Sequence, residues 1–194
     1  MKKKEKALKQ VEIEIEGLKN SPLYKYRVEN SYKPVPGAGS ADAPIVFVGE
    51  APGAKEAVTG EPFIGRAGQF LNELLKSADI RREDVFRTSI VKDRPPKNRD
   101  PLPKEIEIYT PYLDRQIEII RPKIIATLGR FAMNYIMERY GLEDSLLPIG
   151  ELHGKIFEAN CSWGHIFIVP LYHPAAAIYN QRLKETLKED FMVL

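Results

Sequence analysis

A short apolar run, from Ile45 to Val48, constrains the fold of this chain more than any other stretch. It shows no alternation of polar and apolar side chains, which is typical of a parallel strand covered on both faces. A segment rich in small residues follows over 49–65, and helical periodicity begins at Arg66. In an open sheet of parallel strands, ligands bind beyond the carboxyl ends of the strands. We therefore expect Glu50, directly after the run, at a ligand-binding edge.

The rest of the chain alternates between strands and helices. Strands are predicted at 44–48, 85–91, 124–128 and 165–170, the last paired in a hairpin with 154–158, and helices at 2–19, 66–78, 104–120, 130–140 and from 179 onward. The passage 32–40, rich in proline and glycine, is expected to lack regular structure. This order predicts an α/β fold, a three-layer α/β/α sandwich around a central, mostly parallel four-stranded sheet. We expect one domain over 1–194, with 1–20 as an N-terminal amphipathic helix.

The composition excludes several classes of protein. With 194 residues, 43% of them hydrophobic, the chain can bury a core without disulfide bonds. Its one cysteine, Cys161, excludes a disulfide framework within the chain and a metal cluster held by cysteines. No apolar stretch approaches the roughly 18 residues of a membrane span, and no signal-peptide pattern opens the sequence. We expect a monomer located in the cytoplasm, with no membrane partner.

The charges are nearly balanced, so any binding of nucleic acid has to come from local clusters. The formal net charge is only +2 at pH 7. The lysines within 2–9 are typical of a solvated helix face. A more informative cluster, made of Lys92, Arg94, Lys97 and Arg99, lies in or next to a loop that several prolines make rigid. This loop is the better candidate for contacts with phosphate.

Three side chains from separate loops are candidates for a shared site. Glu50 lies among small residues that let a ligand approach the backbone. Phe63 is either a core residue or an aromatic surface on which a ligand stacks. His173 follows the last predicted strand, where it is either a structural hydrogen-bonding residue or a chemical group. If the fold is as predicted, these loops meet at one edge of the sheet.

Six ordered segments then resemble a known family. They are Gly49-Glu-Ala-Pro-Gly53, Thr59-Gly-x-Pro-Phe-x-Gly65, Arg94-Pro-Pro-x-Asn-Arg-Asp-Pro101, Tyr112-Leu-Asp-Arg-Gln-Ile117, Arg121-Pro-Lys-x-Ile125 with Leu128-Gly-Arg130, and Tyr172-His-Pro-Ala-Ala176. Together they resemble the family 4 uracil-DNA glycosylases over about 21–190. The resemblance implies an enzyme that flips a deaminated base, above all uracil, out of single- or double-stranded DNA. It would hydrolyse the N-glycosidic bond and leave an abasic site for base excision repair.

The resemblance also implies roles for individual residues. His173 matches the donor to O2 of the departing base, and Glu50 matches the carboxylate that positions water and faces the cationic sugar. Glu56 is a second carboxylate nearby and the reserve candidate for that role. Base-binding positions are Gly49, Ala51, Pro52, Gly53, Phe63 and Ser89. Phe63 matches the plate on which the flipped base stacks.

Contacts with DNA outside the pocket are expected from two regions. Arg94, Lys97 and Arg99 are candidate phosphate partners, with Ser40 as a further one. Ala175, Ile178 and Tyr179 belong to the segment expected to supply a wedge. Either Ile178 or Tyr179 is large enough to fill the space that the flipped base leaves in the stack.

Two departures from the family pattern change what is expected. Relatives bind a [4Fe-4S] cluster through four cysteines, but the matching positions here are Leu18, Ser21, Asp93 and Tyr109. We therefore expect no cluster and no other metal or cofactor. The family's base-reading asparagine is replaced by Ser89, whose hydroxyl either recognises the base or has no role in recognition. This replacement leaves open a glycosylase for hypoxanthine or xanthine.

A protein without catalysis is the remaining alternative from another class. The chain could bind damaged DNA and release no base, in which case tight binding would come without an abasic product. A dinucleotide-binding dehydrogenase fits poorly, because Gly49-Glu-Ala-Pro-Gly53 lacks the Gly-x-Gly-x-x-Gly spacing.

Overall fold

The structure is a computed structural model that describes residues 2–178 and 180–194. The strands are β1 (Ala38–Gly39), β2 (Ile45–Gly49), β3 (Phe86–Ser89), β4 (Ile124–Leu128), β5 (Phe157–Cys161) and β6 (Gly164–Leu171). The α-helices are α1 (Lys3–Glu16), α2 (Tyr24–Glu29), α3 (Ala54–Thr59), α4 (Arg66–Ser77), α5 (Pro103–Ile120), α6 (Arg130–Arg139), α7 (Ile149–Leu152), α8 (Pro174–Ala177) and α9 (Gln181–Phe191). Short 3₁₀ helices are η1 (Arg82–Asp84), η2 (Pro96–Asn98) and η3 (Glu143–Ser145).

The strands form one sheet of six in the order β1-β3-β2-β4-β6-β5. The four inner strands, β3, β2, β4 and β6, are parallel and correspond to the four predicted strands. The sheet is wider than predicted because β1 and β5 add antiparallel edges. β5 is the first arm of the predicted hairpin, but it begins three residues later than the predicted range 154–158. The prediction of a mostly parallel sheet is confirmed, but its count of four strands is wrong.

The edge strand β1 corrects the expectation of irregular structure over 32–40. Ala38 pairs with Arg87, and Gly39 pairs with Phe86. Gly39 has φ +132°, and a Cβ there would lie 2.0 Å from Val85 O. Glycine thus lets the chain approach β3 closely enough to form a ladder that no alternation in the sequence announces.

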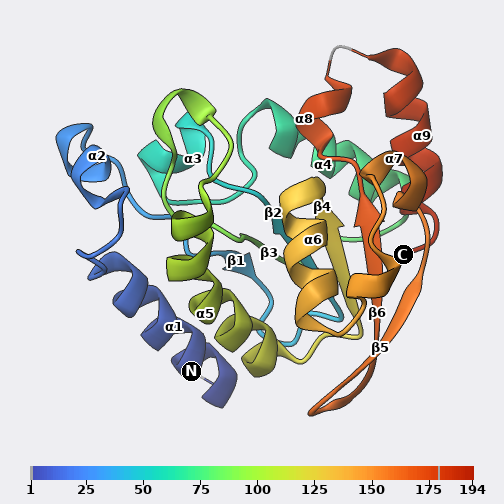
Figure 1. Cartoon of the computed structure of the whole chain (residues 1–194), viewed down its shortest axis with the longest axis horizontal. Helices are drawn as coiled ribbons and strands as arrows, with labels where there is room; N and C mark the ends of the chain where they lie inside the picture. The colour runs from blue at the N-terminus through green and yellow to red at the C-terminus, as the bar shows by residue number, and fades with distance from the viewer. Residues whose placement is uncertain (1, 179) are drawn as a thin grey trace.

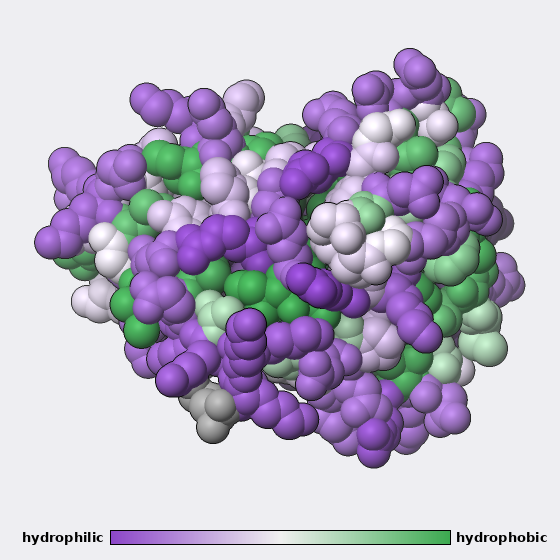
Figure 2. Space-filling model, turned by 90° about the horizontal axis from the view of Figure 1, so that it is seen from below, coloured by the Kyte–Doolittle hydropathy of each residue, from purple (hydrophilic) through white to green (hydrophobic). Residues whose placement is uncertain are grey.

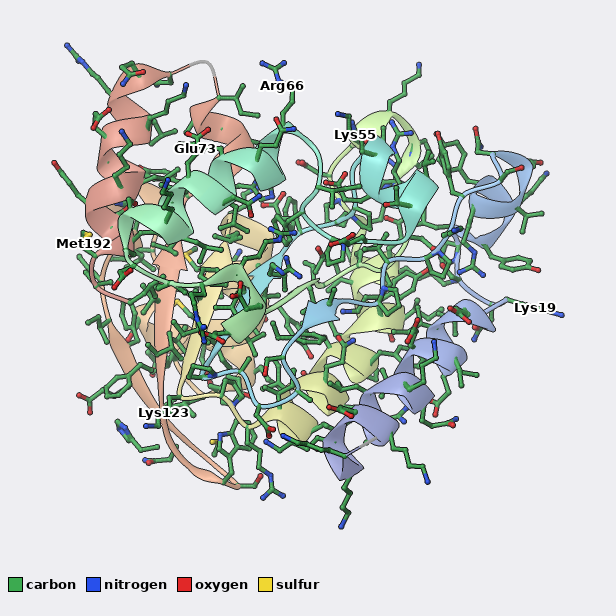
Figure 3. The ribbon with its side chains drawn as sticks, turned by 180° about the vertical axis from the view of Figure 1, so that it is seen from behind. Lys19, Lys55, Arg66, Glu73, Lys123 and Met192 are labelled. Carbon is green, nitrogen blue, oxygen red and sulfur yellow. The ribbon has the colours of Figure 1, made fainter. Side chains whose placement is uncertain are left out.

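Helices cover both faces of the sheet, as a three-layer sandwich requires. Val46 and Val48 of β2 point into a core shared with α5 and α6, while Ile45 and Phe47 point into a second core with α4 and α9. In Figure 1, α1, α5 and α6 lie in front of the sheet, and Figure 3 shows α4 and α9 on the opposite face. Continuous burial of β2 explains why its sequence is apolar without alternation.

The predicted long helices are confirmed with small changes at their ends. α1 ends at Glu16 and α9 begins at Gln181, whereas α4, α5 and α6 lie within one residue of their predicted bounds. None of the helices in the described part of the chain is both long and apolar enough to span a bilayer.

The four parallel strands direct their carboxyl ends to one edge of the sheet. The other end of the molecule, seen in Figure 2, is mostly hydrophilic, with apolar side chains in small patches between polar ones. Because ligands bind beyond the carboxyl ends of parallel strands, we expect the site in the loops that follow these strands.

Candidate functional site

A cavity of about 490 Å³ opens where the chain leaves β2, β3 and β6. Its walls come from the loop after β2, the connection between α3 and α4, the loop after β3, and α8. Glu50, Phe63 and His173 all line this cavity. The predicted meeting of three loops is therefore what the structure shows.

Glu50 lies partly buried beside the N-terminus of α6. A Cβ built on Gly129 would lie 2.3 Å from Glu50 Oε1, so the carboxylate rests directly against that glycine. Burial raises the pKa of Glu50, while the backbone N–H groups of Phe131 and Arg130 oppose the rise. The helix N-terminus supports the charged form, and the raised pKa makes the carboxylate a stronger base than an exposed glutamate.

Gly129 is the residue that makes this arrangement possible. Its φ of +92° is in the region that L side chains rarely adopt, and a Cβ there would also lie 3.3 Å from His173 Cβ. Both catalytic candidates therefore pack against one glycine. In the sequence, Gly129 stands out only as part of the segment Leu128-Gly-Arg130, because its contacts with residues so distant in the chain are not visible there.

His173 is held in one tautomer by its own helix. It is the N-cap residue of α8, and its Nδ1 accepts a hydrogen bond from Ala175 N at 3.1 Å. Because Nδ1 accepts, the proton of the neutral ring is on Nε2. Burial lowers the pKa of His173 to about 4, although the charge of Glu56 acts in the opposite direction. At pH 7 the ring is therefore neutral and has a donor at Nε2.

Phe63 forms an aromatic wall of the cavity with an unusual backbone. Its ring centroid lies 6.4 Å from that of His173, with 29° between the ring planes. The residue has a φ of 55°, which is rare for a bulky side chain. Arg82 Nη2 donates to Phe63 O at 3.0 Å and to Pro62 O at 3.2 Å. Gly68 lets α4 pack close, since a Cβ there would lie 2.0 Å from Phe63 O.

Glu56 holds the other side of the same connection. Its Oε1 accepts hydrogen bonds from Ile64 N at 3.0 Å and from Gly65 N at 2.7 Å. A Cβ on Gly53 would lie 2.7 Å from Glu56 Oε2, so glycine is required there unless the carboxylate moves. Because Glu56 is only 8% exposed and bonded to backbone, the geometry favours Glu50 as the carboxylate that acts on water.

Gly49 and Ser89 lie next to each other under the aromatic ring. They are register partners in the parallel ladder of β2 and β3. A Cβ on Gly49 would lie 2.7 Å from Phe63 Cζ and 3.3 Å from Ser89 Oγ. Ser89 lines the cavity and is 5% exposed. Its position fits a base-reading role.

Lys92 is not part of the surface cluster in which the sequence analysis placed it. The side chain is fully buried, and its Nζ donates to Thr88 Oγ1 at 2.6 Å, to Ser89 O at 2.7 Å and to Gln116 Oε1 at 2.9 Å. Burial lowers the pKa of Lys92 well below its usual value. This residue therefore supports the strand end that carries Ser89, rather than contacting phosphate.

Most of the remaining predicted pocket residues lie at the cavity. Ala51, Pro52, Gly53, Ala175 and Ile178 line it. Tyr179 lies outside the described residues. Further lining residues, not among the predicted ones, include Lys55, Arg66, Asn98, Asp100 and Pro101. Figure 3 shows Lys55 and Arg66 at the same end of the molecule and Lys123 at the opposite end.

The four residues predicted to contact phosphate differ in their surroundings. Arg99 lines the cavity and forms a two-pronged ion pair with Glu105, at 2.9 and 2.6 Å. Arg94 is partly buried and donates to Tyr32 Oη at 2.6 Å, whereas Lys97 is exposed. Ser40 was predicted as a phosphate partner, but it does not lie at the cavity. Its N–H donates to Val85 O at 3.2 Å, at the amino end of β3 and away from the cavity.

The residues at the four cluster positions do not fit an iron–sulfur cluster. Tyr109 hydrogen-bonds to both Ser21 and Asp93, and Leu18 provides no side-chain ligand. Over 2–178 and 180–194, no group of three or more His, Cys, Asp and Glu side chains is arranged to hold a metal ion. The donor set is a carboxylate and two hydroxyl groups, where a cluster needs thiolates.

Comparisons with known proteins agree with this geometry. The sequence model described as Uracil DNA glycosylase superfamily matches residues 36–192. A Type-4 uracil-DNA glycosylase of Archaeoglobus fulgidus is 48% identical over 81% of this chain and 78% of its own length. One of Saccharolobus solfataricus is 44% identical over 92% of this chain and 80% of its own length. A Type-5 uracil-DNA glycosylase of Thermus thermophilus is 34% identical over 60% of this chain and 59% of its own length.

Proposed function

This chain belongs to the uracil DNA glycosylase superfamily, and from that premise we propose that it hydrolyses the N-glycosidic bond of uracil in DNA. The product would be an abasic site, the starting point of base excision repair. The relatives named Type-4 uracil-DNA glycosylase support this assignment. The single observation that carries it is that Glu50, Phe63 and His173 line one cavity at the carboxyl ends of the parallel strands.

The departing base is stabilised by His173. Breaking the bond between C1′ of the sugar and N1 of uracil leaves the electron pair on the ring, where negative charge reaches O2. A neutral imidazole with its proton on Nε2 donates to that oxygen, and the geometry that assigns this tautomer is the bond from Ala175 N to Nδ1. Phe63 provides a face for stacking, which contributes on the order of 1–3 kcal/mol per base.

The sugar is attacked by water under the influence of Glu50. The water oxygen bonds to C1′ on the opposite side from the leaving base, and one water proton passes to the carboxylate. The raised pKa of Glu50 favours this transfer, while the nearby N–H groups of α6 keep the group ionised beforehand. The negative charge of Glu50 also stabilises the cationic character of C1′ in the transition state.

We also propose that this chemistry needs no iron–sulfur cluster, because the four matching positions offer no thiolate. The test is the iron and sulfide content of the purified protein, before and after anaerobic reconstitution with iron and sulfide. We expect neither to bind in stoichiometric amount. A cluster with its visible absorption band after reconstitution would overturn this part.

Ser89 favours a second candidate, a glycosylase with a different base preference. Its hydroxyl is shorter than an amide and can reach a base edge through one water molecule. A pocket that reads the base in this way is compatible with hypoxanthine or xanthine in place of uracil. Both candidates use the same catalytic groups.

The decisive experiment is a single-turnover assay on oligonucleotides that contain uracil, hypoxanthine, xanthine or thymine. We expect abasic product from uracil in both single strands and U·G pairs. Product only from the purines would establish the second candidate. Tight binding to uracil DNA without abasic product would overturn both and identify a silent binder of damaged DNA. As parts of the same proposal, we place the protein in the cytoplasm, in contact with DNA, and expect a monomer in solution.

A further inference from the structure

A buried ion pair joins the N-terminal helices to the end of β3. Arg27 of α2 and Asp93 are 6% and 1% exposed, and Arg27 Nη1 lies 3.3 and 3.2 Å from the two carboxylate oxygens of Asp93. A buried charge without a partner is costly, so each member depends strongly on the other. The pair therefore fixes the distance between α2 and the segment after β3.

The same guanidinium binds the C-terminal end of α1. Arg27 Nη2 donates to Glu16 O at 3.1 Å and to Leu18 O at 3.3 Å. These carbonyl groups lie at and just beyond the last turn of α1, where a cation is favourable. Arg27 thus ties α1, α2 and Asp93 together.

A tyrosine completes the network from α5. The fully buried Tyr109 has one hydroxyl proton, which it donates to Asp93 Oδ2. Its oxygen accepts the proton of Ser21 Oγ at 2.6 Å, and Ser21 Oγ in turn accepts from Leu23 N at 3.1 Å. Burial raises the pKa of Tyr109, so the phenol keeps its proton at neutral pH. With Arg27 beside Asp93, the carboxylate accepts the phenol proton, which leaves the phenol oxygen to accept from Ser21.

The network ends where the wall of the cavity begins. Asp93 directly precedes the loop 94–101, which contributes Pro95, Asn98, Arg99, Asp100 and Pro101 to the cavity. Three members of the network, together with Leu18, occupy the positions where the family pattern has cluster cysteines. Hydrogen bonds and an ion pair therefore fill the volume in which the resemblance places a metal group.

We propose that Arg27, Asp93, Tyr109 and Ser21 form a positioning network that holds the loop 94–101 in its DNA-binding geometry, in place of a metal cluster. The proposal rests on the proposed function, because binding of DNA is the role that this function gives to the loop 94–101. None of the four residues lines the cavity, so their effect passes through the backbone of the loop.

Tyr109→Phe is the variant that tests this, because it removes one hydroxyl group and keeps the ring. Glu14→Gln is the matched control. Glu14 pairs with Arg115 and so joins α1 to α5, the same layer, without contact to the loop. Asp93→Asn is the stronger variant, and Tyr109→Phe covers the case in which Asp93→Asn fails to fold. All are compared well below their melting temperatures.

The two readouts are hydrogen exchange of peptides that cover 92–102, and kcat and KM on a uracil oligonucleotide. We expect Tyr109→Phe to speed exchange in 92–102 but not in β4, and to lower kcat/KM about 10- to 100-fold, mainly through KM. Glu14→Gln should leave both unchanged. Unchanged exchange and kcat/KM in Tyr109→Phe, even with a lower melting temperature, would overturn the proposal. If the wild-type protein releases no uracil, the proposed function fails, but the exchange comparison still decides whether the network holds the loop.

Discussion

At the scale of single residues, two carboxylates at the cavity differ in what they contact. Glu50 rests against the N-terminus of α6 and faces the cavity, whereas Glu56 is bonded to the backbone of the stacking connection. Two acids close together in the sequence thus have different surroundings, which is why the proposed role in the attack of water goes to Glu50. The sequence left this choice open because both are near the same glycines.

Replacing Glu50 tests that role. Glu50→Gln keeps the size of the side chain and removes its charge, so we expect single-turnover release of uracil to fall by at least about a hundredfold. Melting should show an intact fold. Glu73→Gln on the exposed face of α4 is the control and should retain wild-type rates. Equal rates in Glu50→Gln and the wild type would refute the assignment.

The pKa of His173 leads to a prediction about acid stability. The imidazole titrates near 6.5 when unfolded and at about 4 when folded, because burial disfavours its charged form. The unfolded state therefore binds more protons between these values, and His173 should make the protein less stable as pH falls from 6.5 toward 4. Thermal melting across this range should show a smaller loss for His173→Gln. An NMR titration midpoint of His173 near 6.5 would contradict the prediction.

At the scale of elements, the connection between α3 and α4, which carries Phe63, is held in place by side chains of α3 and η1. Arg82 holds the carbonyl groups of Pro62 and Phe63, and Glu56 holds the next two N–H groups. Neither set of bonds is predictable from the sequence, because they join residues that are eight or more positions apart.

We expect Glu56→Ala to make the connection between α3 and α4 less stable. Two partly buried N–H groups lose their partner, and a buried donor without a partner costs about 1–3 kcal/mol, so urea unfolding should show a loss toward the lower end of that range. KM for uracil DNA should rise because the ring is less well placed. Lys55→Ala, on the exposed side of the same helix, should leave the free energy of unfolding unchanged. A loss of kcat equal to that of Glu50→Gln, with stability retained, would instead make Glu56 a catalytic group.

The elements also show how far the sequence could be interpreted. The parallel strands and α4, α5 and α6 were predictable, because their apolar periodicities are local properties. β1 was not, since its ladder depends on the close approach that Gly39 allows. The burial of Lys92 and the position of Ser40 were also missed. The sequence shows that each residue is in or near a loop, but its position relative to the cavity depends on tertiary packing.

At the scale of the whole molecule, cationic side chains lie at both ends. Lys55, Arg66 and Arg99 line the cavity, and Lys123 lies at the other end. The net charge of +2 is small, so orientation on DNA depends on these local groups. The candidate loops were predictable from the sequence, but which cations lie at the cavity end required the fold.

The salt dependence of DNA binding tests which lysines contact phosphate. Lys55→Ala and Lys97→Ala should each reduce the slope of log K against log salt by about 0.9, the value for one phosphate contact on B-DNA, without changing the preferred base. Fluorescence anisotropy between low and moderate salt gives the slope. Lys123→Ala should retain the wild-type slope, and an equal reduction there would mean that DNA does not bind at the cavity end.

The left-handed backbone of Phe63 has a consequence for recognition. Its conformational strain is met by Arg82, Glu56 and Gly68 while the chain folds. On the proposed function, a nucleobase that stacks on Phe63 encounters a surface already oriented, and association does not have to supply the ordering entropy of that ring. Discrimination between bases can then depend on how well the shape of each base fits this rigid surface, and no loop has to rearrange for each base.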